Sequence, residues 1–512
     1  MSTQQLFPTV VHMLIDAAEK SPEREALACL GERLNYQAYL NCVIGFHDEL
    51  AQLDVAHERV ALVMGNSINI CIAMFAAQMA RAQIVPMNPM YTEHELRPML
   101  KDAEVKVILY DASNKDCVEK LAKELNIAVQ LYIDDEKGKC LTEWINKENL
   151  SLPSVLPGKD DLAILQFTGG TTGRAKGANL SHASIAGNLH QAAVMQKPEM
   201  DVERNLCVMP LFHCYAWSVC LYNMVNCRGT MVIVPRYQPD VVLNTFAEEK
   251  ITIFAGSPTL FTGLMNYNGF ERTDFSSLRL SNSGSAPLPA ELLEKWEATT
   301  GTPIMEGYGQ TESGPVISFN PSDRMRKAGS VGIALPDTEI QIVSLDNGND
   351  VLAANENGEI RIKGPQVMSG YRNLPNETAE ALRDGWLYTS DIGYLDDDGY
   401  LFITARKKEM ILVSGYNVFP REIEEVLFLH PAIREAAVVG KQDEYRGELP
   451  VAFVVHNGSE AIGDEDLKEY CKEHLALYKV PDEFRVVEVL PKTAVGKVDK
   501  VELTALANIQ LH

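Results

Sequence analysis

The stretch QFTGGTTGRAKGA, which runs from Gln166 to Ala178, decides how the rest of the chain is interpreted. An apolar run of strand length, 161–167, leads into a segment of glycines and threonines, and Lys176 follows. Glycine lets backbone N–H groups approach a polyanion closely, threonine hydroxyls add donors, and lysine adds a mobile positive charge. A flexible surface linker could share this composition. The strand before the loop and the lysine after it favour a phosphate-binding loop.

The spacing of this loop does not fit the P-loop of kinases and ATPases, which is G-x-x-x-x-G-K-[ST]. After Gly173 the chain reads Arg-Ala-Lys176-Gly177, so no hydroxyl residue directly follows the lysine. A P-loop enzyme, whose product would be ADP, is therefore disfavoured. The loop alone does not name a reaction.

The composition indicates an ordinary globular protein of several domains. The 512 residues are 46% hydrophobic and 23% charged, and the chain is too long for a single core. The formal net charge of −24 disfavours a nucleic-acid partner, because phosphate contacts need a basic face. A nucleotide site would have to be locally basic against this overall charge.

The ten cysteines are scattered, with no C-x-x-C pair, which disfavours a disulfide framework or a cysteine metal site. We therefore expect a cytoplasmic protein. No apolar run approaches the roughly 20 residues that a transmembrane helix needs, and the first residues carry no targeting signal. Peripheral membrane contact and a homodimer are left open.

The order of apolar runs predicts an α/β body. Strands are expected at 60–64, 105–110, 161–167, 251–255 and 278–281, a strand and loop at 84–89, and helices at 10–19, 68–80 and 93–101. Strands that alternate with helices of this length form β-α-β units around a parallel sheet.

The pattern changes twice in the second half of the chain. From about Gly329 short alternating strands predict a β-barrel-like or β-rich subdomain. Beyond the charged run 406–409, a helix at 422–429, strands at 436–440 and 451–455 and a helix at 465–474 predict a compact α+β unit. We therefore expect an N-terminal domain, 1–405, and a small C-terminal domain, 406–512.

Four further motifs carry a family resemblance. They are GYGQTE at 307–312, LYTSD at 387–391, ARKKEMILVSGY at 405–416 and PKTAVGK at 491–497. With the glycine-rich loop, their order and spacing resemble the adenylate-forming superfamily, which includes acyl-CoA synthetases, luciferases and nonribosomal adenylation domains. The likeness extends from about residue 10 to 505. It is greatest to bacterial fatty-acyl-CoA synthetases, which share TGGTTG, where most relatives have serine at the position of Gly169, and the run GPQVM at 364–368.

This resemblance implies an AMP-forming acyl-CoA ligase with a mobile C-terminal domain. A carboxylate attacks the α-phosphate of ATP to give acyl-AMP and pyrophosphate, and the thiol of CoA then displaces AMP. Catalysis is expected to rest on positioning and charge neutralisation. The implied partners are ATP, Mg²⁺, CoA and a carboxylic acid, and the implied context is fatty acid metabolism.

The resemblance also assigns nucleotide-binding residues. The phosphate loop would hold the β- and γ-phosphates, Tyr308 would stack on adenine with the Ser-Ala-Pro loop on its other side, and Asp391 would accept from the ribose hydroxyls with help from Arg406. The full set is Thr168, Gly169, Gly170, Thr171, Thr172, Gly173, Lys176, Ser285, Ala286, Pro287, Gly307, Tyr308, Gly309, Gln310, Asp391 and Arg406.

Four residues are assigned to catalysis by the same resemblance. Lys497 would reach the reacting carboxylate and the α-phosphate and offset their charge. Thr311 would donate its hydroxyl to the α-phosphate, and Glu312 would bind Mg²⁺, which prefers carboxylate oxygen. His213 matches an aromatic-gate histidine beside the acyl site. Its structural alternative is a core histidine that caps a helix.

The C-terminal domain is assigned the second half-reaction. Lys408 falls at the hinge position of the family, about which the C-terminal domain would rotate. That rotation would withdraw Lys497 and bring Ser414, Gly415 and Tyr416 to line a tunnel for CoA. Gly415 suits a close approach of backbone to pantetheine.

The acyl pocket is expected to involve Tyr215, Trp217, Asn282, Gly284 and Val316. Trp217 could shorten the pocket, stand at its entrance or simply pack in the core. The resemblance favours a medium- or long-chain fatty acid, and a phenylpropanoid- or benzoate-type aryl acid is the alternative.

Two other functions remain alternatives, and the chain departs from the family at two places. An acyl-AMP ligase could load a carrier-protein pantetheine arm instead of CoA, and a degenerate member could bind nucleotide as a sensor. The presence of Glu312, Asp391, Arg406 and Lys497 disfavours the sensor. Ser390 stands where most relatives have glycine and Ala405 where they have glycine or aspartate, which leaves the ribose geometry open.

Overall fold

The computed structural model describes residues 5–134, 136–147, 150–168, 175–322, 324–414, 416–443, 445–458, 462–493 and 497–509. The chain forms two compact units. Unit 1 comprises Met1–Glu339 and Ile362–Leu387, and unit 2 comprises Ile340–Arg361 and Tyr388–His512. The domain division expected at residue 406 stays a prediction.

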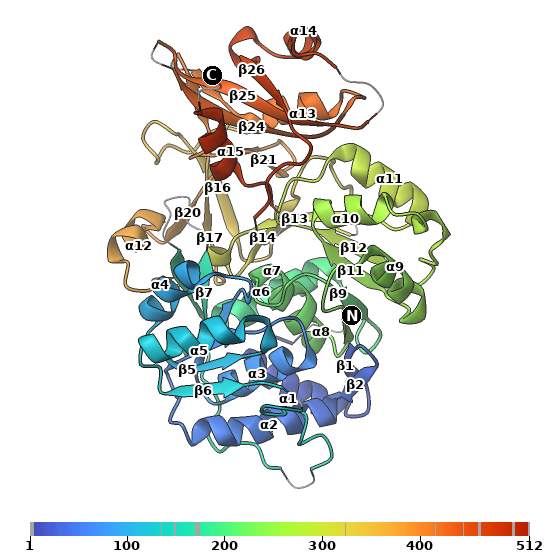
Figure 1. The fold of residues 1–512 in the computed structure, drawn as a ribbon, viewed down its shortest axis with the longest axis vertical. Coiled ribbons are helices and arrows are strands. Elements are labelled where there is room, and N and C mark those ends of the chain that lie inside the picture. Colours follow the sequence, from blue (N-terminus) through green and yellow to red (C-terminus); the bar gives the residue numbers. More distant parts are fainter. Residues whose placement is uncertain are drawn as a thin grey trace. The chain divides into compact units, whose positions relative to one another are not determined.

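A seven-stranded sheet forms one half of unit 1 (Figure 1). Its order is β18 (Gly370–Tyr371), β8 (Lys176–Ser181), β7 (Leu162–Thr168), β4 (Gln83–Met87), β3 (Arg59–Val63), β5 (Val105–Tyr110) and β6 (Val129–Tyr132). The pairs from β7 to β6 are parallel, and β8 and β18 join antiparallel at one edge. Helices α1 (Val10–Lys20), α2 (Tyr36–Ala51), α3 (Ile68–Met79), α4 (Glu93–Ala103), α5 (Lys115–Glu124) and α6 (His182–Gln196) accompany it.

A nine-stranded sheet forms the other half of unit 1. Its order is β15 (Ile333–Ala334), β14 (Val316–Phe319), β13 (Ile304–Gly309), β12 (Leu280–Ser283), β11 (Ile253–Gly256), β9 (Arg204–Cys207), β10 (Thr230–Ile233), β1 (Glu25–Cys29) and β2 (Glu32–Asn35). The strands from β13 to β1 are parallel. Strand β11, Ile-Phe-Ala-Gly, is buried along its whole length and is the apolar run typical of a strand covered on both faces.

The helices beside the nine-stranded sheet close an aromatic core. In Figure 1, α9 (Pro239–Glu248), α10 (Pro258–Met265) and α11 (Ala290–Thr300) lie together beside β11 and β12. Phe254 of β11, Phe261 of α10 and Trp296 of α11 are each fully buried. The rings of Phe261 and Trp296 meet edge to face with centroids 4.7 Å apart. Such contacts add to area burial and fix the helices on the sheet.

Short elements complete unit 1. They are α7 (Cys214–Ala216), a π-helix η2 (Trp217–Tyr222), α8 (Asn223–Asn226), α12 (Pro375–Ala381), β19 (Leu382–Arg383) and the 3₁₀ turns η1 (Ala112–Asn114), η3 (Phe270–Arg272) and η4 (Thr311–Ser313). π-Helical turns are rare and occur often at functional sites.

Two further sheets hold most of unit 2. One has the order β16 (Glu339–Val343), β17 (Gly358–Lys363), β20 (Trp386–Leu395) and β19, with β21 (Leu401–Arg406) beside β20. The other has the order β23 (Tyr416–Val418), β22 (Ile411–Val413), β25 (Gly447–His456) and β24 (Ile433–Asp443), with β26 (Glu483–Val486) beside β25. Helices α13 (Pro420–Phe428), α14 (Asp464–His474) and α15 (Lys500–Ala507) and the turn η5 (Leu477–Lys479) complete the unit.

The predicted elements are confirmed, with small shifts at two strands. The strands expected at 251–255 and 278–281 begin two residues later, at Ile253 and Leu280. The N–H of Ile251 donates to Phe246, and that of Leu278 to Phe275. Ile251 and Leu278 are apolar and buried, so the sequence pattern includes them in the strands, but their hydrogen bonds belong to preceding turns.

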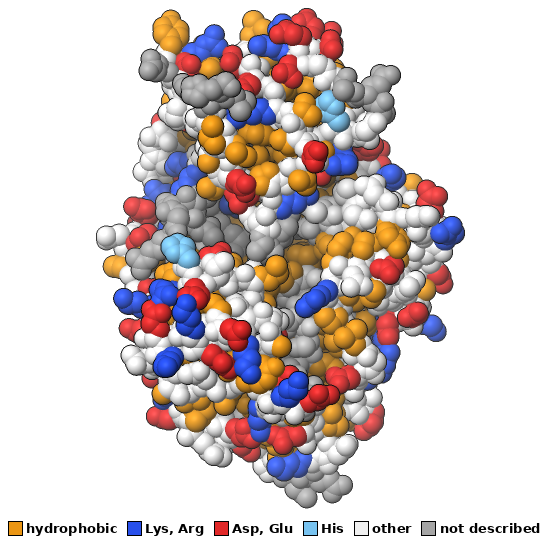
Figure 2. Space-filling model, viewed as in Figure 1, with side chains coloured by type: hydrophobic (Ala, Val, Ile, Leu, Met, Phe, Trp, Pro, Cys, Tyr) orange, Lys and Arg blue, Asp and Glu red, His pale blue; other side chains and the backbone are white. Residues whose placement is uncertain are grey.

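The surface mixes both signs of charge, as Figure 2 shows for one face. Among the described residues, no helix combines the length and the apolar character that crossing a membrane requires.

Candidate active site

Part of the phosphate loop lies outside the described residues, namely Gly169, Gly170, Thr171, Thr172 and Gly173. Its two ends are placed. Thr168 ends β7 directly opposite Lys176 of β8, and the Thr168 hydroxyl donates to the Lys176 carbonyl at 3.4 Å. The intervening chain therefore connects two antiparallel strands at the edge of the seven-stranded sheet, which is the strand–loop–lysine arrangement that the sequence predicts.

The two predicted adenine segments follow neighbouring parallel strands. Ser283 at the end of β12 pairs with Glu306 of β13, and Gly307 and Tyr308 come next on β13. The buried Glu306 carboxylate accepts the Leu288 N–H at 3.0 Å, which ties the loop after β12 to β13. The Ser285–Pro287 loop and Tyr308 therefore lie at one edge of the nine-stranded sheet, where ligands of open α/β sheets commonly bind.

The glycines of the GYG motif have a steric reason of their own. A Cβ atom on Gly307 would lie 2.6 Å from the Phe319 ring, and one on Gly309 would lie 2.1 Å from the Pro315 carbonyl oxygen. Both glycines allow β14 to pack closely on β13. This packing role of the two glycines does not depend on a bound ligand.

The turn η4 presents Thr311 and Glu312. Gln310 and Ser313 fix this turn, because the Gln310 N–H donates to the Ser313 hydroxyl at 3.2 Å and that hydroxyl donates to the Pro315 carbonyl at 2.6 Å. The Thr311 hydroxyl donates to the Cys214 sulfur at 3.4 Å. Thr311 thereby contacts Cys214, the residue that follows His213 in the sequence.

A tyrosine that sequence reasoning missed contacts both halves of the predicted phosphate and metal site. The Tyr371 hydroxyl donates to Glu312 Oε1 at 2.7 Å, and the Lys176 ammonium lies 5.1 Å from the Tyr371 ring centroid. Burial, and then the charge of Glu312, raises the pKa of Tyr371, so its phenol stays protonated. Tyr371 follows the GPQVM run by three residues, and that run served only as a mark of likeness.

The residues present fit a magnesium ion bound chiefly by substrate. Among the described residues, no group of three or more His, Cys, Asp or Glu side chains could hold a metal. Mg²⁺ is commonly held by one or two carboxylates together with nucleotide phosphates, so a single carboxylate such as Glu312 suffices.

The candidate acyl residues of 213–217 form α7 and the start of η2. His213 caps α7, because its Nδ1 accepts the Tyr215 N–H at 3.2 Å. The contact of His213 with the Tyr215 N–H is therefore that of a helix-capping histidine, the structural alternative given above. Trp217 is fully buried and its indole N–H donates to the Gln166 amide at 3.0 Å, so Trp217 packs in the core and contacts the strand before the phosphate loop.

Tyr215, Asn282 and Gly284 are neighbours. The Tyr215 hydroxyl donates to the Asn282 carbonyl at 3.0 Å, and a Cβ atom on Gly284 would lie 3.4 Å from the Tyr215 ring. Asn282 is 1% exposed, and neither its side-chain oxygen nor its side-chain nitrogen has a hydrogen-bond partner among the described residues. Val316 stands apart on β14, where Asn188 binds its N–H and its carbonyl at 2.9 and 2.7 Å.

The predicted ribose pair lies in unit 2. Asp391 of β20 is directly opposite Arg406 of β21, and Arg406 Nε is 3.2 Å from Asp391 Oδ1. Asp391 is 4% exposed. Ser390 has φ +60°, in the left-handed region that favours glycine. This backbone conformation explains why glycine, which most relatives have, suits position 390 better than the serine of this chain.

The remaining residues of unit 2 lie on turns and a hairpin. Lys408 is exposed in a turn in which the Met410 N–H donates to the Arg406 carbonyl at 3.0 Å. Ser414 has φ +51°, and Gly415 lies outside the described residues. Tyr416 is 58% exposed and stacks on Tyr478, with ring centroids 4.7 Å apart.

Lys497 lies just before α15 and is hydrogen-bonded to Thr493. Its N–H donates to the Thr493 hydroxyl at 3.2 Å, and its carbonyl accepts the Thr493 N–H at 2.7 Å. The next turn of chain is anchored by Lys500, whose ammonium is 2.8 Å from Glu424 and 3.1 Å from Glu409.

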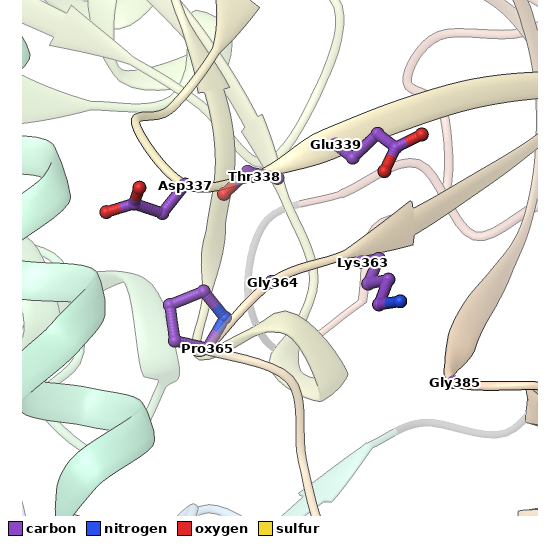
Figure 3. Close-up of a pocket in the computed structure, with 7 residues that line it drawn as sticks. All are labelled: Asp337, Thr338, Glu339, Lys363, Gly364, Pro365 and Gly385. Carbon is purple, nitrogen blue, oxygen red and sulfur yellow. The ribbon is translucent and has the colours of Figure 1, made fainter.

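A cavity of about 660 Å³ in unit 1 is separate from these residues (Figure 3). Its lining is Asp337, Thr338, Glu339, Lys363, Gly364, Pro365 and Gly385. Figure 3 shows the Asp337 and Glu339 carboxylates pointing to opposite sides of Thr338. None of the predicted site residues lines it.

Comparison with known proteins defines the class. Residues 14–372 match the family model described as AMP-binding enzyme, and residues 422–497 match that of the AMP-binding enzyme C-terminal domain. The chain belongs to the AMP-binding enzyme family, whose members bind adenine nucleotide. The predicted superfamily and the predicted α/β fold, with a large N-terminal and a smaller C-terminal domain, are confirmed.

Individual relatives agree with this class. The long-chain-fatty-acid–CoA ligase of Bacillus subtilis is 36% identical, over 96% of this chain and 93% of that one. The 4-coumarate–CoA ligase 2 of rice is 34% identical, over 89% and 84%. The crystal structure of ATP-bound MatB from Rhodopseudomonas palustris has a TM-score of 0.91 at 30% identity and covers 98% of both chains. The predicted enzyme class, an acyl-CoA ligase, is confirmed.

Proposed function

We propose that this chain joins a medium- or long-chain fatty acid to CoA through an acyl-adenylate. In the first step a carboxylate oxygen bonds to the α-phosphorus of ATP while the bond to pyrophosphate breaks. In the second step the CoA sulfur bonds to the acyl carbon, AMP leaves and the thiol proton is released. The observation that carries the choice of acid is the 36% identity to the Bacillus subtilis ligase across nearly the whole of both chains.

The candidate residues have distinct parts in this proposal. Thr311 and Lys176 would bind phosphate oxygens, with Glu312 supplying the carboxylate for Mg²⁺. Mg²⁺ would neutralise phosphate charge when bound. Asp391 would accept from ribose hydroxyls, and Lys497 would offset the charge that develops at the α-phosphate. Ser414, Gly415 and Tyr416 would border the path of CoA after movement at Lys408.

An aryl acid is a second candidate, favoured by Asn282. A buried amide without partners costs about 1–3 kcal/mol, which a ligand hydroxyl or carbonyl near it would offset. A plain fatty chain cannot do this, whereas a hydroxylated aryl acid can. The 34% identity to a rice ligase named for 4-coumarate is consistent with this alternative.

Nucleotide product analysis tests the proposal. Purified protein is incubated with ATP, Mg²⁺ and one acid from a panel of straight-chain and hydroxylated aryl acids, with CoA or a carrier-protein pantetheine arm as acceptor. We expect AMP and pyrophosphate in bulk only with CoA and a fatty acid. Turnover confined to aryl acids would favour the aryl-acid alternative. Faster turnover with the carrier protein than with CoA would make the carrier protein the acceptor. Absence of AMP formation with every acid would contradict the proposed ligase activity.

The half-reactions test Lys497 separately. Lys497→Ala should abolish ATP-dependent formation of acyl-AMP yet retain thioester formation from supplied acyl-AMP and CoA, because the lysine acts on the first step. Equal loss of both half-reactions would contradict this assignment.

A further inference from the structure

The short strand β18 connects two parts of the proposed site within unit 1. Tyr371 of β18 pairs with Ala178 of β8, two residues after Lys176. The Arg372 N–H donates to the Gly177 carbonyl at 2.8 Å, and the Met368 N–H donates to the Glu312 carbonyl at 2.9 Å. Segment 368–372 is therefore bound through its backbone both to the strand that carries Lys176 and to the turn that carries Glu312.

The Tyr371 side chain also connects Glu312 with Lys176, through its hydroxyl on one side and its ring on the other. Its hydroxyl donates to Glu312 Oε1 at 2.7 Å, a charge-assisted bond if the carboxylate is ionised. Its ring lies 5.1 Å from the Lys176 ammonium, within the range of a cation–π contact. In the described part of the chain, Tyr371 is the one side chain that donates to the Glu312 carboxylate, and no ion pair joins Glu312 to Lys176.

The neutral Tyr371 side chain between the Glu312 carboxylate and the Lys176 ammonium affects how each charge could bind a ligand. A direct ion pair would balance the carboxylate with the ammonium, and both would have to be separated before a cation and a phosphate could bind. A phenol satisfies one carboxylate oxygen without cancelling its charge, and an aromatic face holds the ammonium without a counter-ion. Partners of this kind orient a metal ligand, and losing one typically lowers metal affinity roughly 10- to 100-fold.

We propose that Tyr371 is a positioning residue that holds Glu312 and Lys176 apart and oriented for a magnesium–nucleotide complex. The inference rests on the proposed function for the identity of that complex. Tyr371 itself touches neither reacting atom; it acts through the carboxylate and the ammonium.

The test is the metal dependence of Tyr371→Phe, which removes the hydroxyl and keeps the ring. We expect the Mg²⁺ concentration for half-maximal AMP formation to rise about tenfold, while saturating Mg²⁺ restores most of kcat. Mn²⁺ binding in the presence of ATP, followed by electron paramagnetic resonance, should weaken by a similar factor without any turnover. A merely structural loss would lower the rate equally at every Mg²⁺ concentration.

Two further variants keep the test decisive. Tyr39→Phe is the matched control, because Tyr39 is a buried tyrosine of α2 whose hydroxyl donates to the Cys71 carbonyl at 3.0 Å; its metal dependence should match the wild type. In a Glu312→Gln background, Tyr371→Phe should add no further loss of Mn²⁺ binding, since the hydroxyl acts through that carboxylate. If Tyr371→Phe does not fold, Tyr371→Leu, which also lacks a hydrogen-bond donor, is measured in its place.

The outcomes separate this inference from the proposed function. Wild-type protein that forms no AMP would overturn the ligase, and the Mn²⁺ measurement would still decide the role of Tyr371. An active wild type with Tyr371→Phe unchanged in both Mg²⁺ dependence and Mn²⁺ binding, or additive losses with Glu312→Gln, would overturn the inference alone.

Discussion

Glu312 in unit 1 and Asp391 in unit 2 are each proposed to contact the nucleotide or its Mg²⁺, and the two carboxylates are held in opposite ways. Glu312 accepts from a neutral phenol at 2.7 Å, whereas Asp391 lies 3.2 Å from the Arg406 guanidinium. A carboxylate with a neutral donor keeps its charge for an arriving cation. One already balanced by arginine suits neutral hydroxyl donors instead. The charge of the partner thus favours Glu312 as the proposed metal ligand and Asp391 as the proposed ribose acceptor.

Two poorly exposed basic residues outside the proposed site, His182 and Lys500, also differ in whether a charged partner is present. His182, at the start of α6, is 1% exposed, and burial lowers its pKa to about 4. Lys500, at the start of α15, has a side chain 22% exposed. Burial lowers the pKa of Lys500, but Glu424 and Glu409 outweigh it and the net shift is upward. His182 gives up its charge, and Lys500 keeps its charge with two opposite partners.

The largest expected effect separates the two carboxylates. Glu312→Gln should lower kcat/KM by at least roughly 100-fold and raise the Mg²⁺ requirement, because the metal loses an anionic ligand. Asp391→Asn should instead raise the KM for ATP roughly 10- to 100-fold with an unchanged Mg²⁺ requirement, because it weakens hydrogen bonds to a charged group. Initial rates over a grid of ATP and Mg²⁺ measure both. Identical metal dependence in the two variants would contradict the contrast.

Lys500→Met tests the ion cluster of unit 2. Removing the ammonium leaves Glu409 and Glu424 without their counter-charge, so we expect a loss of about 2–4 kcal/mol in unfolding free energy. Because the native pKa of Lys500 is raised, its contribution is complete below the unfolded pKa of about 10.4 and is lost as pH rises through the native value. The free energy of unfolding of wild type and Lys500→Met, measured at pH 8 and above pH 10.5, tests this loss.

Lys500→Arg is the matched control. Arginine keeps its charge at high pH, so this variant should stay stable where the wild type weakens. The same alkaline loss of stability in wild type, Lys500→Met and Lys500→Arg would contradict the predicted role of the Lys500 ion cluster.

His182 should make unit 1 sensitive to acid. The unfolded histidine takes up a proton below about pH 6.5, whereas the native one does so only near pH 4. Stability is therefore lost as pH falls between these values, by up to about 3 kcal/mol. His182→Gln should flatten this slope. Equal slopes in wild type and His182→Gln would contradict the assignment.

The sequence predicted the elements and the reaction class better than it predicted contacts. Apolar periodicity placed β5 at 105–110 and α4 from Glu93, because these elements bury the faces that the pattern marks. Motif likeness brought forward Glu312, Asp391 and Arg406. It did not reveal Tyr371, which meets Glu312 only through the pairing of β18 with β8, or the unpartnered amide of Asn282, since both depend on distant parts of the chain.

The smallest predicted effect concerns the strain beside Asp391. Ser390 is exposed at φ +60°, where a residue with a Cβ atom costs about 1–2 kcal/mol relative to glycine. Part of that gain is lost because glycine makes the unfolded chain more flexible, so Ser390→Gly should stabilise the protein by about 0.5 kcal/mol. Ser151→Gly, at an exposed serine without positive φ, should destabilise it slightly. Calorimetric midpoints measure both. Destabilisation by Ser390→Gly would mean that the serine makes a contribution beyond its backbone, and the KM for ATP would then show whether it acts through Asp391.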